Sequence, residues 1–244
     1  MATQPSAVAP APDPASPVKG LIDVFINPGA LFERLANMPK WGWIVPLVVA
    51  VIVAAAVQIL LHPYSSRAVL GMITDDTSPQ VAQALRENAA KPAVGLNLLW
   101  GAVFYPIAVL IGAAILTGLA AMITAKGKFM TFFTGLMFAK LVLLPASILM
   151  YVIVSLRGVD SVNSMMDLIW SIGPAMFVTD TSHKLLFNIL SQFQLFELWY
   201  FVLLVIMVQK VTGAKRGASI AVAAIYWLLG AAVAIGGLAM GGLK

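Results

Sequence analysis

The sequence contains no cysteine, only two histidines and few charged residues. Without cysteine the chain can form neither a disulfide nor a thiolate metal site, and it has no cysteine nucleophile. Charged residues make up 10% of the chain, whereas a soluble domain of ordinary composition carries about a quarter. The scarcity of charge therefore argues against a soluble fold.

Apolar residues, by contrast, are abundant. They account for 61% of the chain, and the mean hydropathy is +0.94. The first uncharged run, Ile44–Leu61, has eighteen residues, which as a helix would be about 27 Å long and would cross the hydrocarbon core of a bilayer. We therefore predict an all-α polytopic membrane bundle with short interfacial helices and about five spans, at 44–61, 96–124, 132–155, 193–209 and 219–240.

The first eighteen residues differ from the rest of the chain. They contain five prolines and no long apolar run, which is unlike a signal peptide and typical of a segment that stays disordered. We predict a disordered Pro/Ala-rich tail over 1–18 and a membrane domain over 19–244. A Pro-rich docking segment is the alternative interpretation of the tail.

A short helix is predicted before the first span. Asn27 suits its N-cap and Pro28 its first position, and Pro39 follows its end. Trp41 and Trp43 then precede the first apolar run, where tryptophans mark the headgroup region. The pattern predicts an interfacial helix over 27–38 that leads into the membrane.

Basic residues predict the orientation. With five spans, the N-terminal segment and the second and fourth loops share one side and carry eight Lys and Arg, against six on the other side. The positive-inside rule then places the N-terminus in the cytoplasm and the C-terminus outside. Because the net charge of +5 lies mainly in these loops, we do not predict binding to nucleic acid.

Two loops on the outer side have structure of their own. Ser78 and Pro79 resemble a cap and a first helical residue, so a surface helix is predicted there, with Val81, Ala84 and Leu85 packed on the bundle. In the loop over 157–192, the apolar stretch 165–172 is too short to span, and we predict an interfacial or re-entrant helix. A sixth span is the alternative.

Several stretches together resemble a known family. They are the opening NPGALFERLANMPKW with Asn27, Pro28, Phe32 and Pro39, the stretch FQLFELW with Phe193 and Trp199, and the turn TGAKRGA with Thr212 and Gly213. These stretches resemble the Yip domain family of polytopic membrane proteins, and most closely its bacterial branch, over about residues 21–240.

The resemblance implies a five-span fold with its N-terminus inside, in the cytoplasmic (inner) membrane of a bacterium. It also implies a non-catalytic scaffold or accessory role, because some bacterial members accompany ABC-type export systems. The polar Asp-Leu-Tyr-Gly-Pro motif of the eukaryotic trafficking members does not occur in the sequence. Rab binding is therefore not implied.

Two charged residues fall inside predicted spans. Lys140 lies in the third span and Glu197 near the start of the fourth, and an intramembrane charge costs about 2.5–3.5 kcal/mol on insertion scales unless it finds a partner. We favour a structural interpretation, in which the two residues pair or bond carbonyls freed by Pro145. A polar path for a proton or an anion is the alternative.

Prolines and small residues predict local packing. Pro106 and Pro145 predict kinks in the second and third spans. Gly230 with Ala234, and Gly237 with Gly241, give small-xxx-small spacing on the last span, which favours close helix contact within the bundle or between copies.

Catalytic and metal-binding motifs are not found. His62, at the predicted end of the first span, and His183 are far apart in the sequence, and no GxSxG, GxxxxGK[ST], GxGxxG or HExxH motif occurs. We predict no catalytic, metal or cofactor-binding residue. Three functions stay open: a scaffold or accessory subunit, a small transporter or channel that uses Lys140 and Glu197, and a membrane-shaping protein.

Overall fold

The computed structural model describes residues 15–90, 94–123, 127–168, 172–178 and 184–241, and in these ranges the chain is helical with no strand. Ten α-helices follow in order, with short 3₁₀ turns (η) between some of them. Their bounds are α1 Pro17–Ile26, α2 Pro28–Arg34, η1 Leu35–Asn37, α3 Ile44–Leu70, α4 Pro79–Ala90, α5 Val94–Ala121, α6 Phe129–Ala139, η2 Lys140–Leu143, α7 Leu144–Arg157, η3 Val159–Ser161, η4 Met165–Leu168, η5 Pro174–Phe177, α8 Lys184–Ser191, α9 Leu195–Thr212 and α10 Arg216–Gly241.

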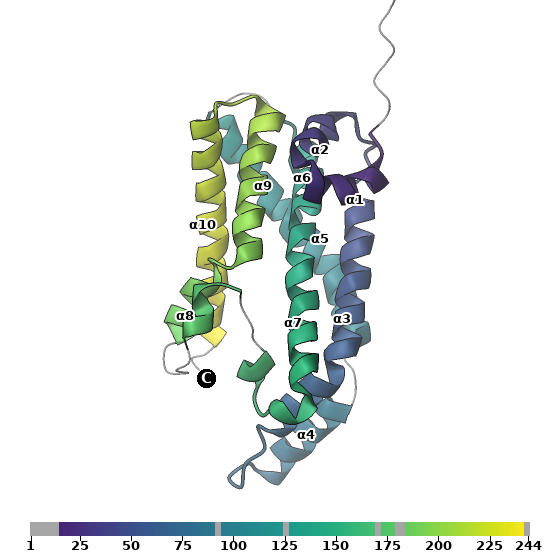
Figure 1. Cartoon of the computed structure of the whole chain (residues 1–244), viewed down its shortest axis with the longest axis vertical. Helices are drawn as coiled ribbons and strands as arrows, with labels where there is room; N and C mark the ends of the chain where they lie inside the picture. The colour runs from purple at the N-terminus through teal and green to yellow at the C-terminus, as the bar shows by residue number, and fades with distance from the viewer. Residues whose placement is uncertain (1–14, 91–93, 124–126, 169–171, 179–183, 242–244) are drawn as a thin grey trace, which may run out of the picture.

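Five helical segments are long and apolar enough to cross a membrane: α3, the inner part of α5, the continuous run α6–η2–α7, α9, and most of α10. The predicted all-α polytopic bundle with five spans is confirmed. One end of the bundle carries α1, α2 and the α9–α10 turn, and the other carries α4 and α8 (Figure 1). We call these the cap end and the α4 end.

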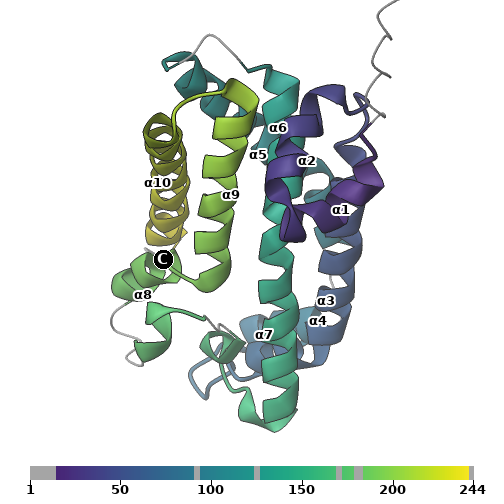
Figure 2. The same ribbon diagram turned by 45° about the horizontal axis from the view of Figure 1, so that its top comes forward.

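The start of the fold lies closer to the N-terminus than predicted. Of the predicted tail over 1–18, residues 1–14 lie outside the described ranges. The helix α1 already begins at Pro17, and the Ser16 side chain caps it by accepting a hydrogen bond from the Lys19 N–H. Asn27 ends α1 and caps α2, because its Oδ1 accepts from the Ala30 N–H at 3.3 Å. The predicted single interfacial helix is therefore a pair of short helices, α1 and α2, that form the cap (Figure 2).

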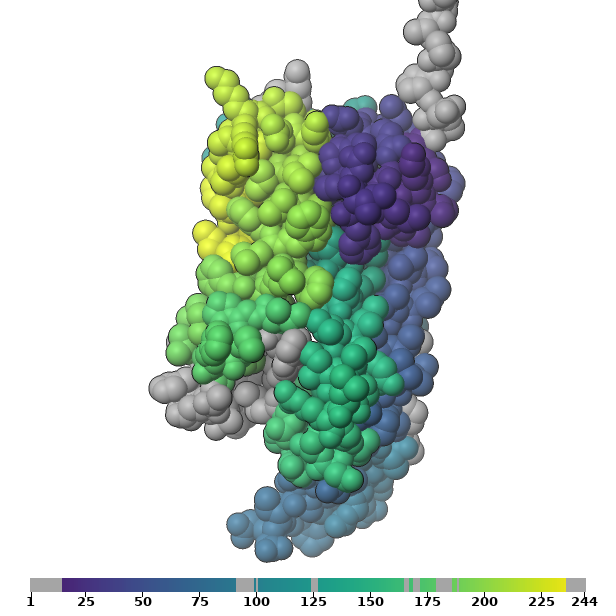
Figure 3. Space-filling view, viewed as in Figure 1, coloured from purple at the N-terminus to yellow at the C-terminus, as the bar shows by residue number. Residues whose placement is uncertain are grey.

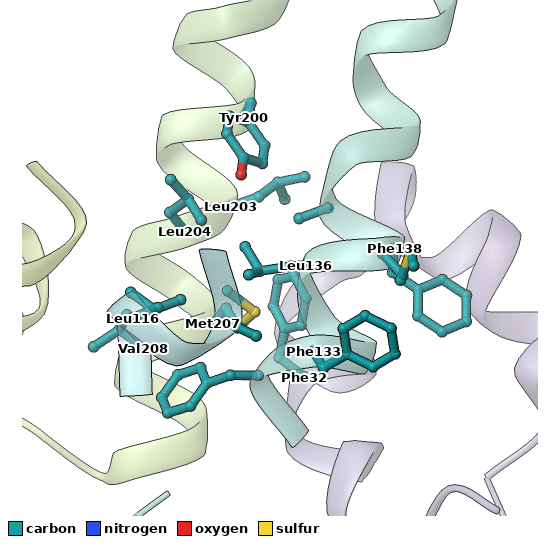
Figure 4. Close-up of a cluster of buried hydrophobic side chains, with 14 of the residues drawn as sticks. Phe32, Leu116, Phe133, Leu136, Phe138, Tyr200, Leu203, Leu204, Met207 and Val208 are labelled. Atoms are coloured by element: carbon teal, nitrogen blue, oxygen red, sulfur yellow. The ribbon is translucent and has the colours of Figure 1, made fainter. Parts of the chain in front are cut away.

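The helix α6 lies at the centre of the bundle. Every residue from Phe132 to Ala139 is buried, which requires neighbours on all sides of the helix. Side chains of α2, α5 and α9 meet it there, including Phe32, Leu116, Leu203 and Met207, as Figure 4 shows. The main hydrophobic core therefore lies in the half of the bundle nearest the cap.

The third span is interrupted in the middle. The α-helix stops at Ala139, continues as η2 and resumes at Leu144, with Pro145 in the first turn of α7. Because proline has no N–H and collides with the carbonyl four residues earlier, the tighter 3₁₀ turn fits before it. Pro106, by contrast, lies within an uninterrupted α5.

The helix α3 does not end at His62-Pro63-Tyr64, where its exit was predicted. It continues through Pro63 to Leu70. Its extra turns are held in place because Ala68 is buried against Val154 and Val162, and because Ser66 donates a 2.7 Å hydrogen bond to the Ala89 carbonyl of α4. Tertiary contacts thus compensate for the hydrogen bond that Pro63 cannot make.

The surface helix α4 forms where it was predicted, but with another face inward. Ala82 and Ala89 are buried, while Val81 and Ala84 are exposed. The apolar side chains chosen from the sequence are thus one position out of register. In the loop after α7, the predicted helix over 165–172 is a 3₁₀ turn at 165–168, and residues 169–171 lie outside the described ranges.

Candidate functional site

Polar side chains gather inside the membrane region where η2 meets α9. Lys140 comes from η2, Glu197 and Tyr200 from α9, and Tyr226 and Trp227 from α10. Each of them interacts electrostatically or through a ring contact with at least one other member of this set. We call these five residues the polar cluster.

Lys140 is held by an aromatic ring. Its ammonium nitrogen lies 5.2 Å from the centroid of the Tyr200 ring, within the range of a cation–π interaction. Glu197 is near enough to attract the ammonium group electrostatically, but the two side chains do not form one of the ion pairs found in the described part of the chain. The structure thus places both predicted intramembrane charges in the polar cluster, and whether they act as a pair or a path stays a prediction.

Glu197 faces a second aromatic side chain. It lies in the first turn of α9, where the helix dipole favours a negative side chain. The Trp227 side chain interacts with its carboxylate. Phe193 and Phe201 in turn pack edge-on against Trp227, with ring centroids 5.6 and 6.0 Å away. Aromatic packing thus fixes the position of the indole beside the carboxylate.

The Tyr200 hydroxyl is buried and has no hydrogen-bond partner among the described residues. The Tyr226 hydroxyl is near enough to interact with it, but the two hydroxyls do not have the geometry of a hydrogen bond. Tyr226 lies against α5, where a Cβ added to Gly112 would come within 2.4 Å of the Tyr226 oxygen. In the polar cluster the Tyr200 hydroxyl is therefore left without a hydrogen bond to any described residue, and Tyr226 fits against α5 only because residue 112 is a glycine.

A second ordered polar region lies at the cap end. The Arg34 guanidinium forms an ion pair with Asp23, whose side chain is 8% exposed, and also donates to the Ala30 carbonyl at 2.9 Å. Glu33 forms an ion pair with Lys210 at the end of α9. The first pair joins α1 to α2, and the second joins α2 to α9.

Residues that carry the resemblance meet at this end, although they are far apart in the sequence. Phe32 is buried in the core with residues of α9, and Thr212 is buried at the end of α9, where its hydroxyl accepts from the Ala214 N–H. Gly213 then ends α9 with φ +70°, a conformation that glycine adopts without strain. Figure 3 shows the cap seated directly against α9.

A sequence model of the Yip1 domain matches residues 22–237, which is most of the chain. The chain belongs to the Yip1 domain family. The family match and the five apolar helices make this a multi-pass membrane protein of the Yip1 type. No curated protein and no solved structure matches the chain.

The other residues chosen from the sequence of this Yip1 protein lie apart from both regions. Gly230 has open space where a Cβ would be, and Ala234 is exposed, so this pair makes no close contact within the described bundle. The second predicted pair, Gly237 and Gly241, falls where the structure describes the backbone but not the side chains. His62 is near the Ser66 hydroxyl at 3.3 Å, and the described residues contain no His, Asp and Glu group of the kind that holds a metal.

Seven members of these two regions were not found as site residues from the sequence: Asp23, Glu33, Arg34 and Lys210 of the two ion pairs, and Tyr200, Tyr226 and Trp227 of the polar cluster. Tyr200 had a usable signal, because it follows Glu197 by three residues and therefore lies on the same face of a helix. Tyr226 and Trp227 had none, since their place beside α9 depends on how α10 packs.

Proposed function

We propose that this Yip1 protein is a non-catalytic scaffold or accessory subunit of a membrane transport or trafficking assembly, and that the cap end is its docking face. The supporting observation is the way the cap is fixed. Two ion pairs and the buried side chains of Val24, Leu31 and Phe32 hold α1 and α2 to the bundle. A partner would therefore meet a preformed surface and would not have to order it on binding.

The proposal places the cap end in the cytoplasm. Both acidic side chains at this end, Asp23 and Glu33, are already neutralised by the ion pairs described above. Five other basic side chains of the cap end have no ion-pair partner in the described part of the chain: Lys19, Lys40, Lys128, Lys215 and Arg216. An excess of unpaired Lys and Arg is typical of the cytoplasmic side, and it suits a partner with an acidic surface.

The partner class that we propose is an ABC-type export system of a bacterial inner membrane. The test is affinity purification from native membranes in a gentle detergent, with the wild type compared with Lys40→Gln/Lys128→Gln at the cap end. Arg67→Gln/Arg86→Gln, which removes two exposed positive charges at the α4 end, is the matched control. We expect a transport ATPase or permease to copurify in stoichiometric amount with the wild type and the control, and to be depleted from the cap variant.

Purification of the protein alone, as a stable homo-oligomer, would contradict the accessory role. It would instead favour contact between copies through the exposed Gly230 and Ala234.

A second candidate function is transport through the polar cluster. Its support is the half-buried Lys140 inside a span, together with the unsatisfied Tyr200 hydroxyl. Purified protein in liposomes would show proton or anion flux that Lys140→Met abolishes. Equal leakage from liposomes with wild type and variant would remove this candidate.

A third candidate is membrane shaping by α1. The helix exposes an apolar stripe of Val18, Ile22 and Ile26, which are 63%, 62% and 74% exposed, and a helix with such a face lies in the interface of one leaflet. Narrowing of vesicles into tubes by the wild type, but not by Ile22→Asp, would support this function over the other two.

A further inference from the structure

A groove runs between α9 and α10 on the outside of the bundle, and neither Lys140 nor Glu197 belongs to its lining. Its volume is about 440 Å³, and it is lined by Phe201, Val202, Val205, Ile206, Gln209, Arg216 and Ile220. Most of these side chains are apolar, and Val202 and Ile220 are 40% and 41% exposed. Because the groove lies along two spanning helices, it opens toward the lipid and not toward water.

The polar residues of the groove are all at one end. Gln209 lies near the end of α9, and Arg216 is the first residue of α10. Neither side chain has a hydrogen bond or an ion pair with the rest of the described chain. Lys210, next to Gln209, is already paired with Glu33, so no acidic side chain of the cap is left for Arg216. The groove is therefore apolar along most of its length and has a positive charge unpaired in the described chain, that of Arg216, at one end.

The length of the groove fits one leaflet. From Phe201 to Gln209 the helix advances about 12 Å at 1.5 Å per residue, and half of the hydrocarbon core is about 15 Å thick. Arg216 lies where α9 ends and α10 begins, which places its guanidinium at the level of the headgroups. The first turn of α10 adds N–H groups without helical partners, which also favour an anion.

We propose that this groove binds one anionic phospholipid from the leaflet on the cap side. An acyl chain lies between Phe201 of α9 and Ile220 of α10, and the phosphate is bound by Arg216 with Gln209 beside it. A lipid fits the groove better than a water-soluble ligand, because an apolar groove inside the membrane is in contact with acyl chains. An anionic lipid fits better than a zwitterionic one, because arginine binds the phosphate and the headgroup brings no positive charge of its own.

The test is native mass spectrometry of the full-length protein released from vesicles that contain equal amounts of phosphatidylglycerol and phosphatidylcholine. We expect the wild type to retain one phosphatidylglycerol, with phosphatidylcholine in the minority. Arg216→Gln should reduce this retention about fivefold, the loss expected for one basic contact at the membrane surface. Lys128→Gln, which removes an equal charge at the same end but outside the groove, is the matched control and should leave retention unchanged.

A second variant tests the apolar part without altering charge. Ile220→Trp should fill the groove and reduce retention of both lipids, whereas Leu228→Trp, an exposed position on α10 outside the groove lining, should not. Equal losses for Arg216→Gln and Lys128→Gln would overturn the proposal in favour of general surface charge. So would photo-crosslinks from position 220 to a protein chain in native membranes, because the groove would then be occupied by a partner helix.

Discussion

At the level of single residues, the polar cluster shows how an intramembrane lysine is accommodated without a direct ion pair. Lys140 would cost about 2.5–3.5 kcal/mol at the centre of an isolated helix. The Tyr200 ring at 5.2 Å returns about 2 kcal/mol if the contact is desolvated, and Glu197 adds a longer-range attraction. The two charged residues could be found from the sequence because any charge is conspicuous in an apolar run. The cation–π contact of Lys140 with Tyr200 could not, because it depends on how η2 packs against α9, although the spacing of Tyr200 from Glu197 already put those two on one face of a helix.

Gly112 provides the space on which this cluster depends. We expect Gly112→Ala to destabilise the protein by about 1–3 kcal/mol, because the added methyl group would overlap the Tyr226 hydroxyl and would force the ring to move. Gly118→Ala, on the same helix, meets nothing within 4 Å and should be neutral or stabilise by up to about 1 kcal/mol. Thermal unfolding in detergent measures both.

A double variant identifies the contact. Tyr226→Phe removes the oxygen that the new methyl group would strike, so Gly112→Ala/Tyr226→Phe should recover most of the loss. If the double variant is as unstable as Gly112→Ala, the cause does not lie at the Tyr226 hydroxyl.

Asp167 gives the loop at the α4 end a dependence on pH. The pKa of its carboxyl is lowered chiefly by the Asn163 N–H, with further bonds from the Ser164 N–H and hydroxyl. Because the folded pKa lies below the ordinary value of 3.8, the stabilisation is complete at neutral pH. It is lost as the pH falls through 3.8 toward the lowered pKa.

Amide hydrogen exchange of residues 163 and 164 should therefore rise as the pH falls through this range, beyond the intrinsic change in exchange rate. Asp167→Asn should already show fast exchange at neutral pH and no such transition. The same pH profile in wild type and variant would show that the carboxylate does not hold this turn.

At the level of helices, local signals were reliable where the chain itself decides the structure. The N-cap at Asn27 and the start of α4 at Pro79 follow from local hydrogen bonding and from the fixed φ of proline. The inward face of α4 and the last turns of α3 depend on contacts with distant segments, such as Ala68 with Val162. The helix α1 was missed because its apolar stripe faces outward and Asp23 faces inward, the reverse of the pattern expected for a helix against a core.

The two ion pairs of the cap differ in burial, and so we expect them to differ in strength. Asp23→Asn should cost about 1.5–3 kcal/mol, because Asp23 is 8% exposed and its loss leaves Arg34 without its charged partner. Glu33→Gln should cost less than about 1 kcal/mol, since Glu33 and Lys210 are 56% and 37% exposed and water screens them.

Limited proteolysis of the segment between α2 and α3, in protein reconstituted into bilayers, reports on the cap separately from the bundle. Asp23→Asn should be cleaved faster than the wild type, and Glu33→Gln at nearly the same rate. Equal effects of the two substitutions would mean that burial does not set the strength of these pairs.

At the level of the whole molecule, packing and charge are both distributed unevenly between the two ends. The main core surrounds α6 near the cap, and the α4 end is held by a smaller cluster around Ala68, Val154 and Val162. The number of spans could be predicted because the thickness of the bilayer fixes the length of an apolar run. The concentration of the core near the cap could not, since all five spans are similarly apolar and only their packing distinguishes α6.

The same asymmetry leads to a prediction about orientation. Because the sequence has no cysteine, a single introduced cysteine can be labelled without background. Lys215→Cys, in the α9–α10 turn, and Asn88→Cys, on α4, are both at exposed positions at opposite ends of the bundle. We expect a membrane-impermeant maleimide added to intact cells to label Asn88→Cys, and to label Lys215→Cys only after the membrane is opened, because unpaired Lys and Arg are typical of the cytoplasmic side. Labelling in the opposite order would put the cap outside. It would then remove the cytoplasmic docking face on which the scaffold proposal depends, while leaving the lipid groove to be tested in the other leaflet.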